Sequence, residues 1–231
     1  MKRKKRVIQN KTRNYLIGLA VIIVLSLFGS KLPSSVKDLL QTNDHQTSTT
    51  FKKGSGTAKT SSINSGKAVK GIIDNKNPTF SKSDLADSSN GWIKYGALDS
   101  LGRATQANAL LVKSLASRGT SADPAIRPTG FVSGQSPYNH SRGHLIGRQL
   151  GGSGDKRENL ATLYQNPVNT PYMTKYENAV RAAVDKGDHV RYQVTPIFSG
   201  KSLFPKAIQM QGKSTTSWGN INFNVTILNK R

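Results

Sequence analysis

Apolar residues in the C-terminal part of the chain fall into short clusters separated by Gly, Pro, Asn and Ser. Apolar and polar residues alternate over 189–198 and 221–228, which predicts two strands with one buried face each. Shorter apolar runs predict further strands at residues 69–73, 91–95, 143–150 and 159–164. A turn is expected at 99–103, after the second of these runs.

Two segments have their apolar residues at helical spacing. Residues 174–186 place four apolar side chains on one side and are followed by Gly187, a typical helix C-terminus. Residues 105–116 have a similar spacing and predict a second helix. Gly and Pro punctuate 119–138, which predicts a loop. The pattern favours an α+β fold, a mainly antiparallel sheet flanked by helices.

The N-terminus has the pattern of a targeting segment. A basic run over 1–13 precedes the uncharged apolar stretch 15–28, as in a signal peptide or signal anchor. A buried core helix is the less favoured alternative, because the basic flank and terminal position match export. No small-residue cleavage site of the A-x-A type follows, so cleavage and retention as a membrane anchor both stay open. Either outcome predicts an extracellular location, secreted or held on the outer face of the membrane.

Composition divides the rest of the chain into two parts. Residues 31–68 are rich in Ser, Thr, Gly and Lys, which predicts a disordered basic tether. Residues 69–231 hold nearly all of the predicted strands and helices and form the predicted folded domain. With the targeting segment assigned to 1–30, the chain is predicted to have three parts.

The charge balance narrows the class of partner. The chain carries 34 Lys and Arg against 12 Asp and Glu, a formal net charge of +22. Residues 69–231 alone carry 21 basic and ten acidic side chains, so the predicted domain is itself basic. This favours a polyanionic partner, namely nucleic acid, anionic lipid or a wall polymer. The absence of cysteine excludes disulfides, Cys-ligated metal centres and a thiol nucleophile.

Candidate chemistry begins with the stretch SRGHLIGR at 141–148. His144 lies near Arg142 and Arg148, and positive neighbours lower the pKa of a histidine, which keeps it neutral as a general base must be. The guanidinium of one arginine can also donate hydrogen bonds to two phosphate oxygens at once. Taken alone, the stretch is better explained as a surface histidine in a basic loop.

The residues downstream add oxygen ligands. Pro171 suits the first turn of the predicted helix and would place Asn169 at its start. Glu177 and Arg181 would then lie on neighbouring turns of one helix face, which by itself describes an ordinary ion pair. An Asn oxygen, a carboxylate and water together suit Mg²⁺.

These motifs together resemble the DNA/RNA non-specific endonucleases, the ββα-metal nucleases whose signature is DRGH. The resemblance covers roughly residues 90–231 and rests on SRGH, on NLATLYQNPVN and on ExxxR. It is nearest to the DNA-entry and secreted nucleases of Gram-positive cocci. Ser141 stands where the family usually has Asp. Compared with Asp, the serine retains a hydrogen-bonding oxygen but has no negative charge.

The resemblance implies roles for individual residues. His144 corresponds to the general base, and Asn169 to the protein ligand of Mg²⁺, with Mn²⁺ as a substitute. Glu177 corresponds to the carboxylate that holds a water of the ion, and Arg181 to the arginine that steadies the phosphate.

Three further residues belong to the same set. Arg142 is expected to contact phosphate, and Asn159 matches a further active-site asparagine. Asn166 competes with Asn169 for the ligand role, and the eight-residue spacing to Glu177 favours Asn169.

The implied function is a Mg²⁺-dependent endonuclease without sequence specificity. It would hydrolyse DNA, and RNA as a second substrate, and leave 5′-phosphate ends. The alternative is a non-catalytic basic surface protein that binds DNA or anionic wall polymers. Binding alone requires the positive charges but neither His144 nor Asn169, so the complete set favours catalysis.

Overall fold

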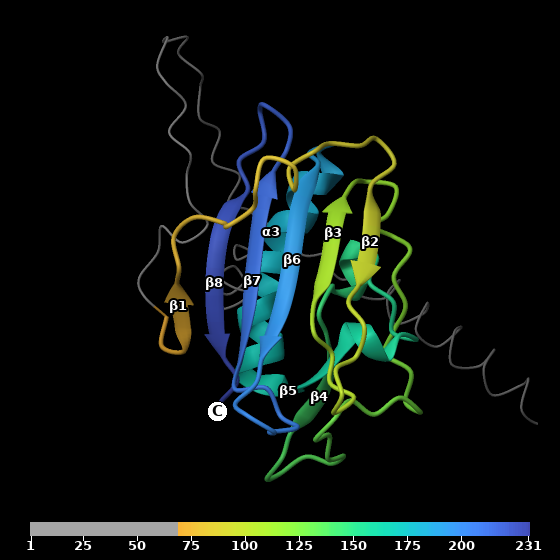
Figure 1. Cartoon of the computed structure of the whole chain (residues 1–231), viewed down its shortest axis with the longest axis vertical. Coiled ribbons are helices and arrows are strands. Elements are labelled where there is room, and N and C mark those ends of the chain that lie inside the picture. Colours follow the sequence, from red (N-terminus) through yellow and green to blue (C-terminus); the bar gives the residue numbers. More distant parts are fainter. Residues whose placement is uncertain (1–68) are drawn as a thin grey trace, which may run out of the picture. The chain divides into compact units, whose positions relative to one another are not determined.

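The computed structural model describes residues 69–231, in which a six-stranded antiparallel sheet forms the largest element (Figure 1). Its strand order is β1-β8-β7-β6-β3-β2. The strands are β1 (Ile72–Asp74), β2 (Trp92–Tyr95), β3 (Ala107–Leu111), β6 (Val190–Ile197), β7 (Ala207–Ser214) and β8 (Asn222–Leu228).

A second, two-stranded sheet lies between β3 and β6 in the chain. Strand β4 (His140–His144) pairs antiparallel with β5 (Leu160–Tyr164), with His144 opposite Leu160. Short 3-10 turns, η1 (Arg148–Leu150) and η2 (Arg157–Asn159), lie in the connection between them. An irregular helical segment, η3 (Gln165–Met173), then leads into helix α3 (Thr174–Asp185). The order β4, β5, α3 is the predicted ββα unit, and the α+β fold is confirmed.

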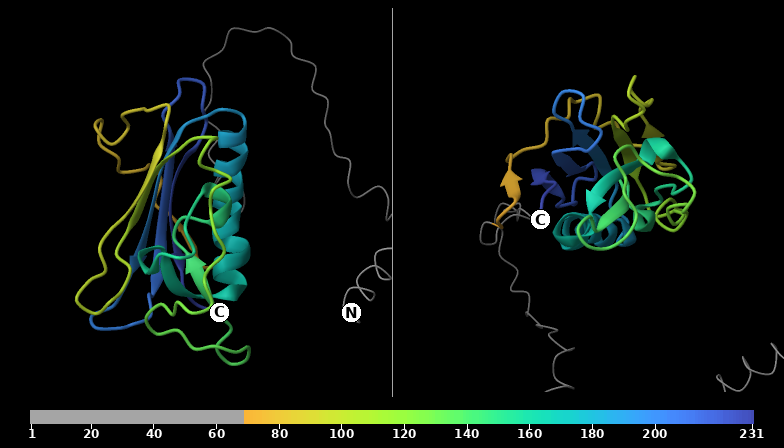
Figure 2. Two further views of the ribbon diagram at one scale, coloured as in Figure 1. Left: turned by 90° about the vertical axis from the view of Figure 1, so that its right-hand side faces the viewer. Right: turned by 90° about the horizontal axis from the view of Figure 1, so that it is seen from below.

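Helix α3 packs lengthwise on one face of the large sheet (Figure 2). Its buried stripe includes Tyr176, Val180 and Val184, and the ring of Tyr176 lies 4.9 Å from that of Phe223 on β8. Strand β6 faces the helix with alternate buried residues, Val190, Tyr192 and Val194 being fully buried. Burying each such large apolar side chain contributes roughly 2 kcal/mol. The ββα unit is thereby attached to the sheet.

Several sequence predictions hold at this level. The helix predicted over 174–186 is α3, and Gly187 follows it with a φ of +93°, the left-handed conformation that glycine adopts readily. The alternating segments are β6 and β8, and the runs near 91–95 and 159–164 are β2 and β5. The run at 69–73 overlaps β1.

The helix predicted over 105–116 is wrong, because residues 107–111 form strand β3. Ala109, Leu110 and Leu111 are all buried although they alternate between two faces, so the strand is covered on both faces, and it pairs with β2 and β6 along its edges. Burial on both faces breaks the alternation by which a strand is recognised and leaves a spacing that also fits a helix.

Two other strand predictions need correction. The strand predicted over 143–150 lies earlier, at 140–144, and residues 148–150 form a 3-10 turn instead. Strand β7 was not predicted, because its sequence AIQMQGKS has only Ala207, Ile208 and Met210 as apolar side chains and contains a glycine. Pairing with β6 and β8 along its length makes it a central strand.

The predicted targeting segment and the tether, residues 1–68, lie outside the described residues. Among residues 69–231, no helix has the length and apolar character needed to cross a membrane.

Candidate active site

One face of β4 lies against the loop that precedes it. Residues two apart on a strand share a face, and here His140, Arg142 and His144 each contact the loop 120–132. His144 Nε2 lies 3.0 Å from the carbonyl oxygen of Thr120. The Nδ1 atom of His140 accepts a hydrogen bond of 3.2 Å from the backbone N–H of Val132. The predicted loop is therefore held along the whole strand.

The partner of His144 determines where its proton lies. A carbonyl oxygen can only accept, so Nε2 carries the hydrogen and Nδ1 keeps a lone pair. Burial lowers the pKa of His144, and the positive charge of Arg148 acts in the same direction. The bond to Thr120 and the charge of Asp155 oppose the shift without reversing it. His144 is thus neutral near pH 7, as a general base must be.

Thr120 is itself fixed by three hydrogen bonds. Its N–H donates to the carbonyl of Gly152 at 3.1 Å. Its Oγ1 accepts from the N–H of Gly154 at 2.7 Å and donates to a carboxylate oxygen of Asp155 at 2.9 Å. These bonds orient the carbonyl that holds His144. Sequence reasoning missed Thr120, because nothing local connects it to a histidine 24 positions away.

Glu177 is a buried carboxylate in the first turn of α3. Its side chain is 7% exposed, and burial raises the pKa to about 7 against weaker lowering by Gln149 and the backbone of Gly147. The amide of Gln149 reaches it only at 3.5 Å. A Cβ atom at position 147 would lie 2.6 Å from Glu177 Oε1, so any larger residue there would have to displace the carboxylate. Sequence reasoning missed Gly147.

Arg181 joins α3 to the loops around the site. Its Nε lies 2.8 and 2.9 Å from the two carboxylate oxygens of Asp185. One terminal nitrogen donates to the carbonyls of Gln149, at 2.7 Å, and Ala116, at 3.0 Å. Within the described residues the second terminal nitrogen keeps its donors available. The expected pair with Glu177 is not formed, because Asp185, one turn further on, takes the guanidinium.

Glu177 and Arg181 line a cavity of about 500 Å³. Arg148 and Gln149 come from η1, and Ala116, Ser117 and Gly119 complete its wall. Gly119 directly precedes Thr120, so the cavity adjoins the residue that holds His144. A buried carboxylate and two arginines around one space can bind a cation and a phosphate next to each other.

Two predicted site residues use their polar atoms in hydrogen bonds within the protein. Arg142 donates to the carbonyls of Ile126, at 2.8 Å, and Pro124, at 3.0 Å, and its guanidinium lies 4.5 Å from the ring of Phe131. Asn159 is fully buried. Its side chain accepts from the N–H of Ile146 at 2.9 Å and donates to the carbonyls of Ile146 and Ser153. In this arrangement both residues hold loops in position.

The two candidate metal ligands lie on η3. Asn169 donates from Nδ2 to Gln165 Oε1 at 3.2 Å, which orients the amide and leaves Oδ1 for a cation. Asn166 is exposed and has an extended backbone. The expectation that Pro171 lies in the first turn of the helix is confirmed, because the backbone is extended at Thr170 and helical from residue 171 into α3. Asn169 is not among the residues that line the cavity beside Glu177.

The donor set fits a hard cation that keeps several waters. Among residues 69–231 no three His, Asp or Glu side chains gather as a metal cage. The amide oxygen of Asn169 and the incompletely paired carboxylate of Glu177 are each of the oxygen type that Mg²⁺ prefers, and of the two only Glu177 lines the cavity. Ser141, at the first motif position, lies 3.4 Å from the carbonyl of Leu163 through its Oγ.

Known proteins match both the sequence and the fold. A family model described as DNA/RNA non-specific endonuclease matches residues 83–216, more than half of the chain. The crystal structure of NucA from Streptococcus agalactiae with magnesium ion bound is similar at 26% identity and a TM-score of 0.59, over 70% of this chain and 82% of that one. The Sda1 nuclease with bound zinc ion has a TM-score of 0.57 and 19% identity, over 69% of this chain and 90% of that one, and shows the shared fold.

Proposed function

The chain belongs to the DNA/RNA non-specific endonuclease family, and on that premise we propose a Mg²⁺-dependent enzyme that cleaves DNA, and RNA as a second substrate, outside the cytoplasm. Family membership makes it a non-specific endonuclease and sets aside a purely binding surface protein. Beyond family membership, we propose the identity of the metal, the roles of the residues, the 5′-phosphate products and the extracellular location.

The observation that carries the proposal is the state of His144. Its Nε2 is engaged by Thr120, so the lone pair on Nδ1 is left for a proton. A lowered pKa keeps that atom unprotonated at neutral pH. His144 would take the proton of a water molecule as the water attacks phosphorus.

The other residues divide the remaining tasks. Asn169 Oδ1 would hold the Mg²⁺ ion, and Glu177 would orient one of the waters of the ion. Bound Mg²⁺ supplies positive charge beside the phosphate oxygens, with Mn²⁺ as a substitute. Arg181 has donors available toward the cavity, and Arg148 lines the same space, so these two would hold the phosphate in line. Arg142 would position the loop 120–132, and Asn159 would position the connection that carries Arg148.

Substrate choice follows from the same features. The positive charge of residues 69–231 attracts the phosphate backbone without reading bases, which fits weak sequence preference. The apolar segment 15–28 would deliver the enzyme to the outside, either secreted or anchored to the outer face of the membrane. The proposed partners are therefore DNA, RNA and, through that segment, the membrane.

The test uses the full chain with plasmid DNA in Mg²⁺ or EDTA. Wild type is expected to degrade the plasmid only with metal, and His144→Ala to lose roughly 10²- to 10⁴-fold in kcat/KM. Asn169→Ala should raise the Mg²⁺ concentration needed for half-maximal rate, whereas the matched Asn166→Ala should not. A shift in Asn166→Ala alone would move the ligand role to Asn166. Full activity of His144→Ala would refute the base assignment.

A further inference from the structure

A cluster of aromatic rings surrounds His140, at the opposite end of β4 from His144. The centroids of Phe204, Tyr164, Tyr138 and Phe131 lie 5.2, 5.5, 5.6 and 6.3 Å from that of the imidazole. We call these five residues the His140 cluster. Tyr138 is 44% exposed, so the cluster presents an aromatic ring to solvent. The proposed chemistry at His144 makes no use of this cluster.

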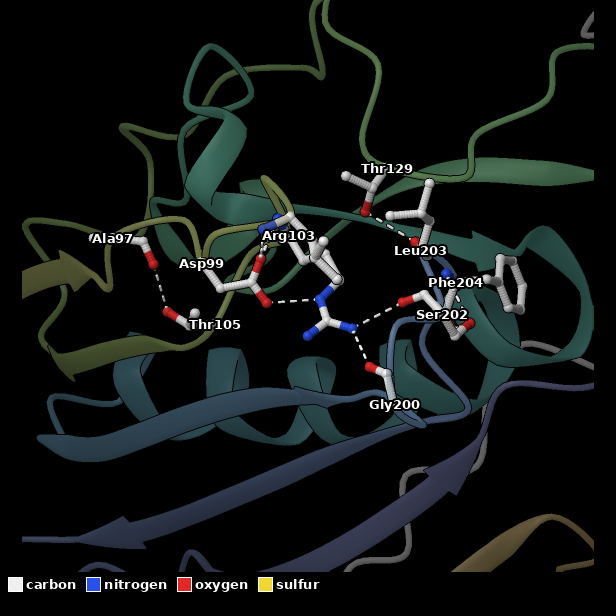
Figure 3. Close-up of polar contacts among 10 residues, drawn as sticks. Ala97, Asp99, Arg103, Thr105, Thr129, Gly200, Ser202, Leu203 and Phe204 are labelled. Carbon is white, nitrogen blue, oxygen red and sulfur yellow. Dashed lines mark hydrogen bonds and ion pairs between the residues drawn. The ribbon is translucent and has the colours of Figure 1, made fainter.

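The loops that form the cluster are held in place by other contacts. Arg103 donates from one terminal nitrogen to the carbonyls of Gly200, at 2.8 Å, and Ser202, at 2.9 Å (Figure 3). Thr129 donates to the carbonyl of Leu203 at 2.9 Å. These bonds fix the β6–β7 connection, which carries Phe204. The ring of Phe204 is thereby fixed against His140 before any ligand binds, which lowers the entropic cost of binding.

A cavity of about 430 Å³ adjoins the His140 cluster. Its volume lies in the range of small-molecule sites. Besides His140 and Gly134 it is lined by four carboxamide side chains, those of Gln135, Asn139, Gln165 and Asn166. Because Nδ1 of His140 accepts from Val132, the neutral imidazole carries its hydrogen on Nε2 and adds a donor. Carboxamides beside aromatic rings can hydrogen-bond the edges of a nucleobase while the rings stack on its face.

One residue of the cavity wall contacts the proposed metal ligand. Gln165 lines it and accepts the hydrogen bond from Asn169, the proposed metal ligand. His140 and His144 lie on the same face of β4, and four strand residues span about 13 Å. The guanidinium of Arg231 lies 4.9 Å from the ring of Tyr164 and supplies positive charge at this end. A nucleic acid strand whose phosphate lies beside an ion held by Asn169 would therefore have a neighbouring base within reach of the cavity.

We propose that this cavity, together with the exposed ring of Tyr138, is a subsite for one unstacked nucleobase near the scissile phosphate. The inference rests on the proposed function, because it takes the strand to be bound at His144. Tyr138 stacks on the face of the base, and the carboxamides contact its edges. Every nucleobase has such a face, so the subsite favours single-stranded or frayed nucleic acid without selecting a sequence.

The test uses the full chain and single-stranded oligonucleotides that carry one abasic residue at successive positions. Wild type should cleave one bond at least about fivefold more slowly when the abasic residue occupies a fixed position relative to it. Tyr138→Ala should lose a similar factor in kcat/KM on intact oligonucleotide and lose the abasic effect. Tyr138→Phe should retain both. Trp218→Ala, which removes an exposed aromatic side chain from the β7–β8 connection, should behave as wild type.

Binding in EDTA separates this inference from the proposed function. Wild type should bind a labelled intact strand at least about fivefold more tightly than Tyr138→Ala does. If wild type cleaves and Tyr138→Ala matches it in cleavage, binding and the abasic effect, the subsite is refuted and the enzyme assignment stands. If nothing cleaves, the proposed function fails, and the binding comparison still decides the subsite in either direction.

Discussion

The carboxylate of Glu177 is buried almost completely and lacks a cationic partner in the described residues. Transfer of a charge from water into such a place is unfavourable, which is why its pKa rises to about 7. Burial favours the neutral form of His144 as well, and for a histidine the neutral form is the one that can act as a base. At the residue scale, burial thus keeps His144 in the form that can accept a proton. It also makes ionised Glu177 unfavourable unless a cation binds beside it.

Replacing this carboxylate should stabilise the metal-free protein. The pKa of Glu177 is about 7 in the folded protein against an ordinary value of 4.5. The contribution of this group to the free energy of unfolding is therefore fully present below pH ~4.5 and is lost as the pH rises through 7. Glu177→Gln has no such loss, so in EDTA at pH 8 its unfolding free energy should exceed that of wild type by up to about 3 kcal/mol. The difference should shrink toward pH 5, and Mg²⁺-dependent activity should fall.

Urea unfolding at pH 5 and pH 8 measures this effect. Glu158→Gln, at a partly exposed glutamate, serves as the matched control and should stay within about 0.5 kcal/mol of wild type. An equal stability difference at both pH values for Glu177→Gln would contradict the explanation by burial.

Helix α3 and the connection after β4 form the site by close approach. The helix brings Glu177 to within contact of Gly147, and Arg181 on the next turn binds the carbonyl of Gln149. Asn159 holds the same connection from inside through Ile146. At the element scale, the position of the carboxylate depends on how a helix and a turn pack, more than on either alone.

Gly147→Ala tests this packing. The added Cβ would lie 2.6 Å from Glu177 Oε1 and must displace the carboxylate. Because small displacements of a catalytic group are costly, kcat should fall by roughly 10²-fold. Residue 147 has a φ of −59°, which alanine adopts without strain, so the variant should fold. Thermal unfolding verifies that the protein is folded, and unchanged kcat in folded protein would refute the role of this contact.

The whole molecule presents a strongly basic domain to its substrate. Residues 69–231 keep an excess of positive charge, so attraction to phosphate is expected from the domain itself as well as from residues 1–68. Such attraction depends on the release of counterions and is the same for any sequence. At this scale the charge explains non-specific affinity and says nothing of catalysis.

Affinity for DNA should therefore fall steeply with salt. In EDTA, the Kd of the full chain for a duplex should rise at least about tenfold between 50 and 200 mM NaCl, because each phosphate contact contributes a slope of roughly −0.9. Fluorescence anisotropy with two duplexes of unrelated sequence measures this, and both should give the same slope. Salt-independent binding, or slopes that differ between the duplexes, would argue against phosphate contacts as the source of affinity.

Much of this architecture follows from local sequence. The one-sided apolar pattern of α3 and Gly187 after it define the helix, because a helix buried on one face repeats its apolar residues every three or four positions. Strands β6 and β8 alternate for the corresponding reason. The SRGH motif and the residues after it were enough to indicate the family, since their identity and spacing need no knowledge of packing.

Only the tertiary structure decided the rest. Strand β3 resembles a helix in sequence because its side chains are buried on both faces of the sheet. Arg142, expected at the phosphate, is taken up by backbone carbonyls of a loop 16 and 18 residues away. The proton on His144 is placed by Thr120, and the pKa of Glu177 is set by burial beneath a turn distant in the chain. Local patterns report how one segment meets its surroundings, whereas charge state and hydrogen-bond partners depend on which segments meet.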